Sequence, residues 1–265
     1  MDKPVKCIIV EGEKRDYRYV AEMLKSFFVG KCQIVTVILP AGQNIYMLYN
    51  SLKEDDFETD LIEILRESGN EALVKELEGY TVQDFDEIFM FFDYDCQEDN
   101  LNRDNSQDIV QEMLSFFNNE TEHGKLYLSY PMVEAVYDYK IGQCDAKTKC
   151  FLPTSEITNY KNIVGENNPN ASRHLGYEEW KEIIAIYALR IQCLFDMDKI
   201  DFKQYRDNVT TETIYDKQKY YVENSNVVFI LSAFPEFLLD YFREDFWAKH
   251  VKRNKFKYDA CEKVS

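Results

Sequence analysis

Short apolar runs alternate with amphipathic segments along the first half of the chain, and this alternation is the strongest constraint on its fold. Val5–Val10 is short, apolar and rich in β-branched residues, which is typical of a buried strand. The segment Asp16–Phe28 carries apolar residues at helical spacing, and Gly30 is placed to end that helix. A strand, a helix and a further strand in succession predict a mainly parallel sheet, because parallel strands need a crossover connection.

The alternation continues through residue 140, which predicts an α/β domain over residues 1–145 with a mainly parallel sheet flanked by helices. The further strands that we expect are Gln33–Leu39, Ile88–Phe92 and Lys125–Ser129, and the further helices are Ile45–Leu52, Asp60–Leu77 with a break at Ser68–Asn70, and a segment near Ile109–Phe117.

The character of the sequence changes after residue 150. Tyr177–Leu194 is apolar on nearly all sides, which indicates a buried helix. Phe234–Phe246 carries Pro235 where a first helical turn would tolerate it, and Asn162–Arg173 has the Asn, Gly and Pro content of a connecting loop. We therefore expect residues 150–265 to form a mostly helical C-terminal lobe packed on the first domain.

The cysteine content and the length of the apolar runs indicate a reducing, membrane-free environment. Seven cysteines are an odd number, and no two of them form a Cys-x-x-Cys pair, so neither a disulfide framework nor a zinc ribbon is expected. No apolar stretch approaches the length of a transmembrane helix, and no signal peptide leads the sequence. These features predict a cytoplasmic protein without membrane contact.

The net charge restricts the partners that the chain can attract by itself. A formal charge of −17 opposes non-specific binding to nucleic acid, whose phosphates prefer basic surfaces. Lys249–Lys257 is a compact basic segment that could contact phosphate, although a solvated helix end has the same composition. Any role on nucleic acid must therefore overcome the overall charge.

Carboxylates follow three of the expected strands. Glu11 comes directly after the first strand, Asp93 and Asp95 follow Ile88–Phe92, and Glu134 follows Lys125–Ser129. Ligand sites in parallel sheets lie beyond the carboxyl ends of the strands, and hard cations such as Mg²⁺ prefer oxygen ligands. The sequence therefore predicts a divalent-metal site at this edge of the sheet.

Each of these carboxylates also has an ordinary structural interpretation. Asp93 and Asp95 could belong to a strand-end turn, and Glu11 could favour the N-terminus of the helix that follows it. Lys14 could contact phosphate or be solvated, and none of the three histidines has metal-ligand spacing. The repetition of the pattern after three strands favours the metal site.

Three segments resemble the TOPRIM domain in the form found in RloB-like and OLD-type proteins of bacterial anti-phage defence. They are Val10–Tyr17, Phe92–Asp95 and Tyr130–Ala135, and the resemblance covers residues 5–140. It implies a nuclease that depends on Mg²⁺ or Mn²⁺. The helical half of the chain resembles no family that we can name.

The resemblance also implies roles for individual residues. Glu11 would act in acid–base chemistry or bind metal, Asp93 and Asp95 would coordinate metal, and Glu134 would be a further ligand. Glu11 and Asp93 are thus the expected catalytic residues. Asp16 falls where those proteins often carry Glu, and its role stays open.

The sequence is compatible with three functions. The first is an endonuclease that acts on DNA or RNA, tRNA included, as the effector of a defence system. It would work as a homodimer or with an ABC-type ATPase. The ATPase would have to be a separate partner, because the chain has no phosphate-binding Gly-x-x-x-x-Gly-Lys-Ser/Thr loop. The second is a non-catalytic protein-binding or sensor module that acts with such a partner. The third is a receiver-like or phosphatase-like domain. Such a domain needs a phosphoacceptor aspartate at a strand end and a lysine on a later strand; Asp93 could be the aspartate, but no suitable lysine follows it.

Overall fold

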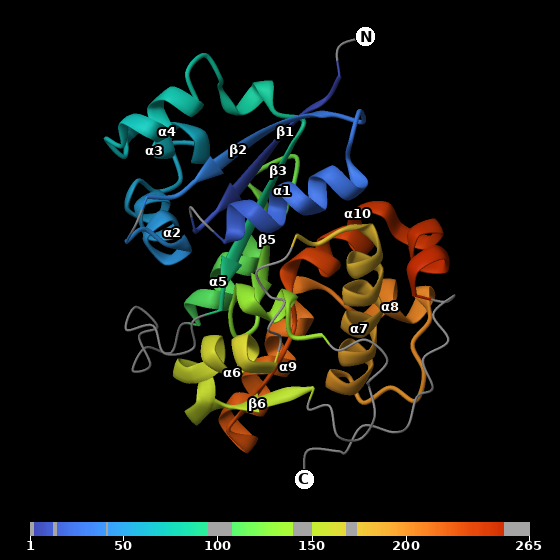
Figure 1. Cartoon of the computed structure of the whole chain (residues 1–265). Coiled ribbons are helices and arrows are strands. Elements are labelled where there is room, and N and C mark those ends of the chain that lie inside the picture. Colours follow the sequence, from blue (N-terminus) through green and yellow to red (C-terminus); the bar gives the residue numbers. More distant parts are fainter. Residues whose placement is uncertain are drawn as a thin grey trace. The chain divides into compact units, whose positions relative to one another are not determined.

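The structure is a computed structural model, and it describes residues 3–12, 15–40, 42–94, 108–139, 150–167 and 174–251 (Figure 1). The chain divides into two compact units. The first unit contains residues 1–92 and 96–127, and the second contains residues 93–95 and 128–265. The expected division lay instead at residues 145–150.

A five-stranded sheet has the order β2-β1-β3-β5-β4. Strand β1 pairs in parallel with both β2 and β3, while β4 and β5 pair antiparallel. The expectation of an α/β fold with a mainly parallel sheet flanked by helices is thus confirmed. The strands are β1 (Val5–Val10), β2 (Gln33–Ile38), β3 (Glu87–Asp93), β4 (Asn118–Asn119) and β5 (Gly124–Ser129).

The central strands β1 and β3 are buried nearly along their whole length. All residues of β1 after Val5 are buried, and so are the five residues Ile88–Phe92 of β3. Lys6 is the charged exception in β1, and it forms an ion pair with Glu87, the residue opposite it on β3. Continuous burial explains why both strands are almost entirely apolar, since both faces of a covered parallel sheet must avoid water.

In the first unit, capping side chains and glycine mark the ends of several of the described α-helices. Asn44, Asp60, Asn70 and Asp108 each cap a helix by accepting hydrogen bonds from backbone N–H groups. Gly69 has φ +72°, which favours glycine, and it lies in the break that was expected between two short helices. The helices are α1 (Asp16–Phe27), α2 (Ile45–Glu54), α3 (Leu61–Glu67), α4 (Glu71–Glu76) and α5 (Ile109–Phe116), with a 3₁₀ helix η1 (Val82–Asp84).

The second unit is mostly helical but also contains two short antiparallel strands. These are β6 (Phe151–Pro153) and β7 (Val227–Phe229), and an isolated bridge joins Tyr130 to Leu231. None of the described helices is long and apolar enough to cross a membrane. The helical elements are η2 (Val133–Val136), η3 (Thr154–Asn159), α6 (Tyr160–Asn167), α7 (Tyr177–Leu194), α8 (Phe202–Asn208), α9 (Thr211–Ser225) and α10 (Ala233–His250).

One expectation for the second unit is wrong in part. The segment Asn162–Arg173 was expected to be a loop, yet its first six residues belong to helix α6, and the rest lie outside the described residues. Tyr160 and Val164 are both buried, four positions apart on α6. Their burial stabilises a helix that local propensity does not favour.

Candidate functional site

Two acidic residues of the first unit lie at the turn that follows β1. Glu11 comes directly after Val10 and is half-buried, and Asp16 is the first residue of α1. A side chain on Gly12 would overlap Oδ2 of Asp16, so the Asp16 carboxylate lies against the backbone of Gly12. The turn therefore brings Asp16 beside the residue that follows Glu11, and glycine leaves the room for it.

The strand register shows where the carboxylates after β1 and β3 fall in the chain. Val10 pairs with Phe91 in parallel alignment. Glu11 follows Val10 by one residue, and Asp93 follows Phe91 by two. Asp93 ends β3, is half-buried and belongs to the second unit, whereas Glu11 belongs to the first.

Within the second unit, the residue after Asp93 is tied to the end of β5. The backbone N–H of Tyr94 donates to the carbonyl oxygen of Ser129 at 2.9 Å, and the Tyr94 ring lies 5.0 Å from the ring of Tyr130. Tyr94 is buried. The backbone position next to Asp93 is therefore held by packing, which is what a ligating side chain at a strand end requires.

Glu134 lies in the short helix η2 and is only 5% exposed. Its charge contributes to the raised pKa of Tyr160, after the larger effects of burial and of Asp138. A buried carboxylate is costly unless cations or hydrogen-bond donors surround it. Glu134 thus belongs to the polar interior of the second unit rather than to an exposed edge.

The residues next to Glu134 form a group that we call the Asp138 cluster, made of Asp138, Tyr160 and Arg190. The Tyr160 hydroxyl donates to Oδ2 of Asp138 at 3.0 Å, and Nη2 of Arg190 lies 3.5 Å from Oδ1. Arg190 also donates to the carbonyl oxygens of Asp138 and Ile230. Burial and the negative charge of Asp138 hold the pKa of Tyr160 well above 10, so its phenol stays neutral and can donate.

Sequence reasoning missed this cluster, although one sign of it was present. Arg190 is an isolated cation in the apolar stretch of α7, and it is 8% exposed. A buried arginine normally has an acidic or carbonyl partner. Its partners could not be named in advance, because Asp138 follows η2 and Ile230 follows β7, and both lie far from Arg190 in the sequence.

The candidate ligands suit a hard cation in kind. Glu11, Asp93 and Glu134 all supply carboxylate oxygens, which is the donor type that Mg²⁺ prefers. Lys14 and Asp95 fall outside the described residues. Within the described ranges, no three His, Cys, Asp or Glu side chains lie close enough together to hold a metal ion.

The described histidines show no ligand arrangement. His250 is 1% exposed, and burial followed by the charges of Lys249 and Lys181 lowers its pKa to about 4. His123 is exposed and stacks on Phe116 with ring centres 4.4 Å apart. Packing accounts for the placement of both side chains.

Comparisons with protein-family models, with curated proteins and with solved structures found no match for this chain.

Proposed function

We propose that this chain is a nuclease of the TOPRIM type that depends on Mg²⁺ or Mn²⁺ and cleaves phosphodiester bonds of DNA or RNA, tRNA included. The observation that carries the proposal is the parallel pairing of β1 with β3 in the middle of the sheet. Each of these buried strands is followed or ended by a carboxylate, Glu11 in one case and Asp93 in the other. We further propose that the nuclease is the effector of a bacterial anti-phage defence system.

The proposal assigns distinct work to the acidic residues. Glu11 would accept a proton or bind metal, while Asp93 and Asp95 would bind metal, with Glu134 as a further candidate ligand. A bound divalent cation would lower the pKa of the attacking water and offset the charge that develops on the phosphate. Asp16, against Gly12, adds a second negative charge beside Glu11 and would favour cation binding.

The acidity of the chain indicates that it needs an additional basic surface to bind nucleic acid. A charge of −17 repels a polyanion, and residues 54–87 contain thirteen acidic and only two basic residues. A basic surface would come from a second copy of the chain or from an ABC-type ATPase subunit. Lys14 and the Lys249–Lys257 segment are the candidates for phosphate contacts within the chain itself.

The test compares the full chain with three variants on plasmid, linear DNA and total tRNA, each with Mg²⁺ or Mn²⁺ and with a chelator. Glu11→Gln and Asp93→Asn remove one proposed catalytic carboxylate each, and Glu58→Gln removes an exposed carboxylate outside the proposed site. We expect cleavage to need metal and to fall by about 100-fold or more in the first two variants, since each loses transition-state stabilisation. Glu58→Gln should cut normally.

Two results would contradict the proposal. Cleavage that persists in both Glu11→Gln and Asp93→Asn would remove these residues from the reaction. Titration calorimetry of Mn²⁺ on the same proteins covers the case in which the wild type does not cleave. Mn²⁺ binding that the two variants lose would support the metal site even in an inactive preparation. A wild-type chain that neither cleaves nor binds Mn²⁺ more tightly than the two variants has no such metal site.

A second function, protein binding without catalysis, is favoured by the charge of the surface. Acidic surfaces suit contact with a basic protein partner, such as the ATPase subunit considered above. In this case Glu11→Gln would leave both partner binding and protection against phage unchanged. The nuclease hypothesis expects the same variant to keep its fold and to lose protection.

A further inference from the structure

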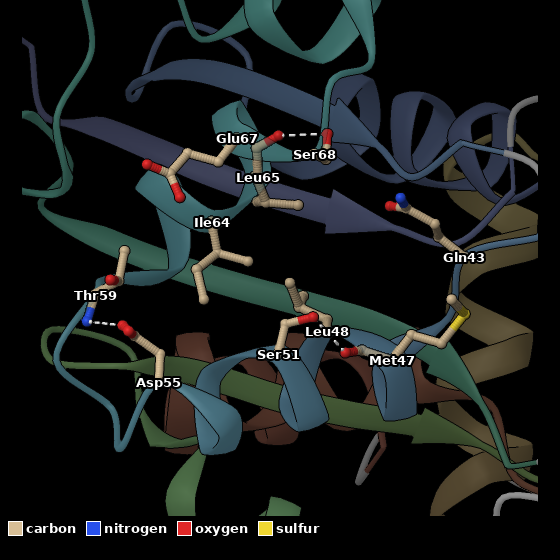
Figure 2. A pocket seen from close by; sticks show the side chains of 10 residues that line it. All are labelled: Gln43, Met47, Leu48, Ser51, Asp55, Thr59, Ile64, Leu65, Glu67 and Ser68. Carbon is tan, nitrogen blue, oxygen red and sulfur yellow. Dashed lines mark hydrogen bonds between the residues drawn. The ribbon is translucent and has the colours of Figure 1, made fainter.

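A cavity of about 330 Å³ lies between α2 and α3 of the first unit (Figure 2). This volume is at the lower end of the range found for small-molecule sites. Leu48 of α2 and Ile64 of α3 supply apolar surface in its middle, together with Leu65. In Figure 2, Asp55, Thr59 and Glu67 lie toward one end of the cavity and Gln43 lies toward the other.

The polar groups around this cavity are mainly acceptors, because several of their hydrogen atoms are already used. The hydroxyl of Ser51 donates to the carbonyl oxygen of Met47 at 3.0 Å, and that of Ser68 donates to Leu65 at 2.7 Å. The N–H of Thr59 donates to Oδ2 of Asp55 at 2.8 Å. The carboxylates of Asp55 and Glu67 offer only oxygen lone pairs, so a ligand at that end must bring its own donors, while the amide of Gln43 at the other end can either donate or accept.

The charge of the cavity has the same implication. Asp55 and Glu67 are acidic, and no basic residue is among the described residues that line it. The surrounding acidic stretch of residues 54–87 strengthens the negative potential there. A cation is therefore attracted, while an anion is repelled.

We propose that the cavity between α2 and α3 binds a small aliphatic amine, with its cationic end at Asp55 and Glu67 and its carbon chain against Leu48 and Ile64. The amide of Gln43 would accept a hydrogen bond from a second amino group at the far end. The class of ligand is thus an aliphatic diamine or polyamine, or the corresponding guanidine. This site is separate from the proposed nuclease residues and does not depend on that function.

The experiment follows the methyl signal of Ile64 by NMR while putrescine is added to the full chain at low salt. 1,4-Butanediol has the same chain length without charge, and succinate has it with opposite charge. We expect a saturable shift with putrescine and with agmatine, and none with butanediol or succinate. A saturable shift with butanediol or succinate of similar midpoint would overturn the assignment.

Matched variants test the geometry. Glu67→Gln and Asp55→Asn should each weaken putrescine binding about threefold, since both carboxylates are exposed. Asn at position 55 can still accept the hydrogen bond from Thr59. Glu63→Gln, on the exposed side of α3 and outside the cavity lining, makes the same charge change and should leave binding as it is.

A lysine built into the cavity provides a stronger test. Ser51→Lys places an ammonium group at an exposed position of α2 that lines the cavity, and we expect it to abolish the putrescine response. Val74→Lys adds the same charge on α4 outside the cavity and should bind putrescine normally. Unchanged binding by Ser51→Lys would overturn the proposal. Tighter binding of Nα-acetyl-lysine amide than of putrescine would also overturn it, because it would point to a lysine of a protein partner.

Discussion

At the scale of single residues, Arg190 of the second unit is a buried cation that holds three oxygen acceptors. It contacts the Asp138 carboxylate and donates to two backbone carbonyl oxygens, while remaining 8% exposed itself. Removing one partner of a buried pair leaves the other partner desolvated and unpaired, which costs more than the pair contributes. The Asp138 cluster should therefore respond very differently to the loss of its cation and to the loss of its phenol.

We expect Arg190→Met to lower the free energy of unfolding by about 2–4 kcal/mol and Tyr160→Phe by about 1–2 kcal/mol. Methionine keeps the packing of α7 but leaves three acceptors without their donor, whereas phenylalanine removes one hydrogen bond to Asp138. Urea unfolding followed by circular dichroism measures both. Tyr220→Phe, at a position 58% exposed, is the control and should change stability little. Equal effects of Arg190→Met and Tyr220→Phe would show that the cluster contributes nothing.

The carboxylates after the strands could be predicted, while their surroundings could not. Glu11 and Asp93 directly adjoin apolar runs, so the local pattern is sufficient to place them at strand ends. Glu134 also follows its strand closely, but its charge acts on the buried Tyr160 of α6, which no local pattern connects to it. When a site is assembled from distant segments, the sequence shows its residues singly and not their contacts. Here the one visible sign was a charged residue, Arg190, within an apolar helix.

At the scale of helices and strands, elements with strong local signals were predicted well. The break between α3 and α4 was visible because Gly69 and the capping residue Asn70 adjoin one another. Strands β6 and β7 have three residues each, and their pairing joins residues 151 and 229. Such a pairing depends on long-range contacts, so the sequence alone shows at most that Val227–Phe229 is apolar.

The last turn of α10 contains His250, whose surroundings disfavour the protonated imidazole. A helix C-terminus favours a protonated histidine, but burial of His250 and the nearby charges of Lys249 and Lys181 lower its pKa from 6.5 to about 4. Glu178 acts in the opposite direction and has the smallest effect. Burial therefore outweighs the helix dipole, and His250 is neutral in the folded protein above about pH 4.

This lowered pKa makes stability depend on pH in a defined direction. Below pH 6.5 the unfolded chain binds a proton at His250 that the folded chain does not bind, so the stability that His250 contributes is present above pH 6.5 and is lost as the pH falls toward 4. We expect the loss to reach about 1–2 kcal/mol at pH 5. Urea unfolding of the wild type and of His250→Gln at pH 7, 6 and 5 isolates this contribution. The difference between their free energies of unfolding should shrink as the pH falls. A difference that stays constant between pH 7 and pH 5 would contradict this assignment.

At the scale of the whole molecule, the two compact units differ from the domains that composition suggests. The division falls within β3 and within β5 rather than in a linker, so no Gly- or Pro-rich stretch marks it. Composition shows where helices replace strands, but it does not show which chain segments pack into one unit. The border of the second unit depends on contacts between distant segments, such as the bridge between Tyr130 and Leu231.

The charge of −17 should make the stability of the protein rise with salt. Like charges repel one another in the compact state, and raising NaCl from about 10 mM to about 150 mM shortens the screening distance from about 30 Å to about 8 Å. Exposed ion pairs such as Lys53–Glu112 weaken at the same time, but each contributes at most about 1 kcal/mol. Repulsion should therefore dominate, and the urea midpoint should increase.

A triple variant, Glu54→Gln, Asp56→Asn and Glu58→Gln, tests whether the acidic stretch of residues 54–87 causes this response. All three side chains are exposed, so the changes reduce charge with little loss of packing. We expect the variant to be more stable than the wild type at low salt and to gain less from NaCl. Urea is the suitable denaturant because it leaves the ionic strength unchanged. If wild type and variant gained equally, the salt effect would come from general changes in hydration, and repulsion within this stretch would not limit the stability of the fold.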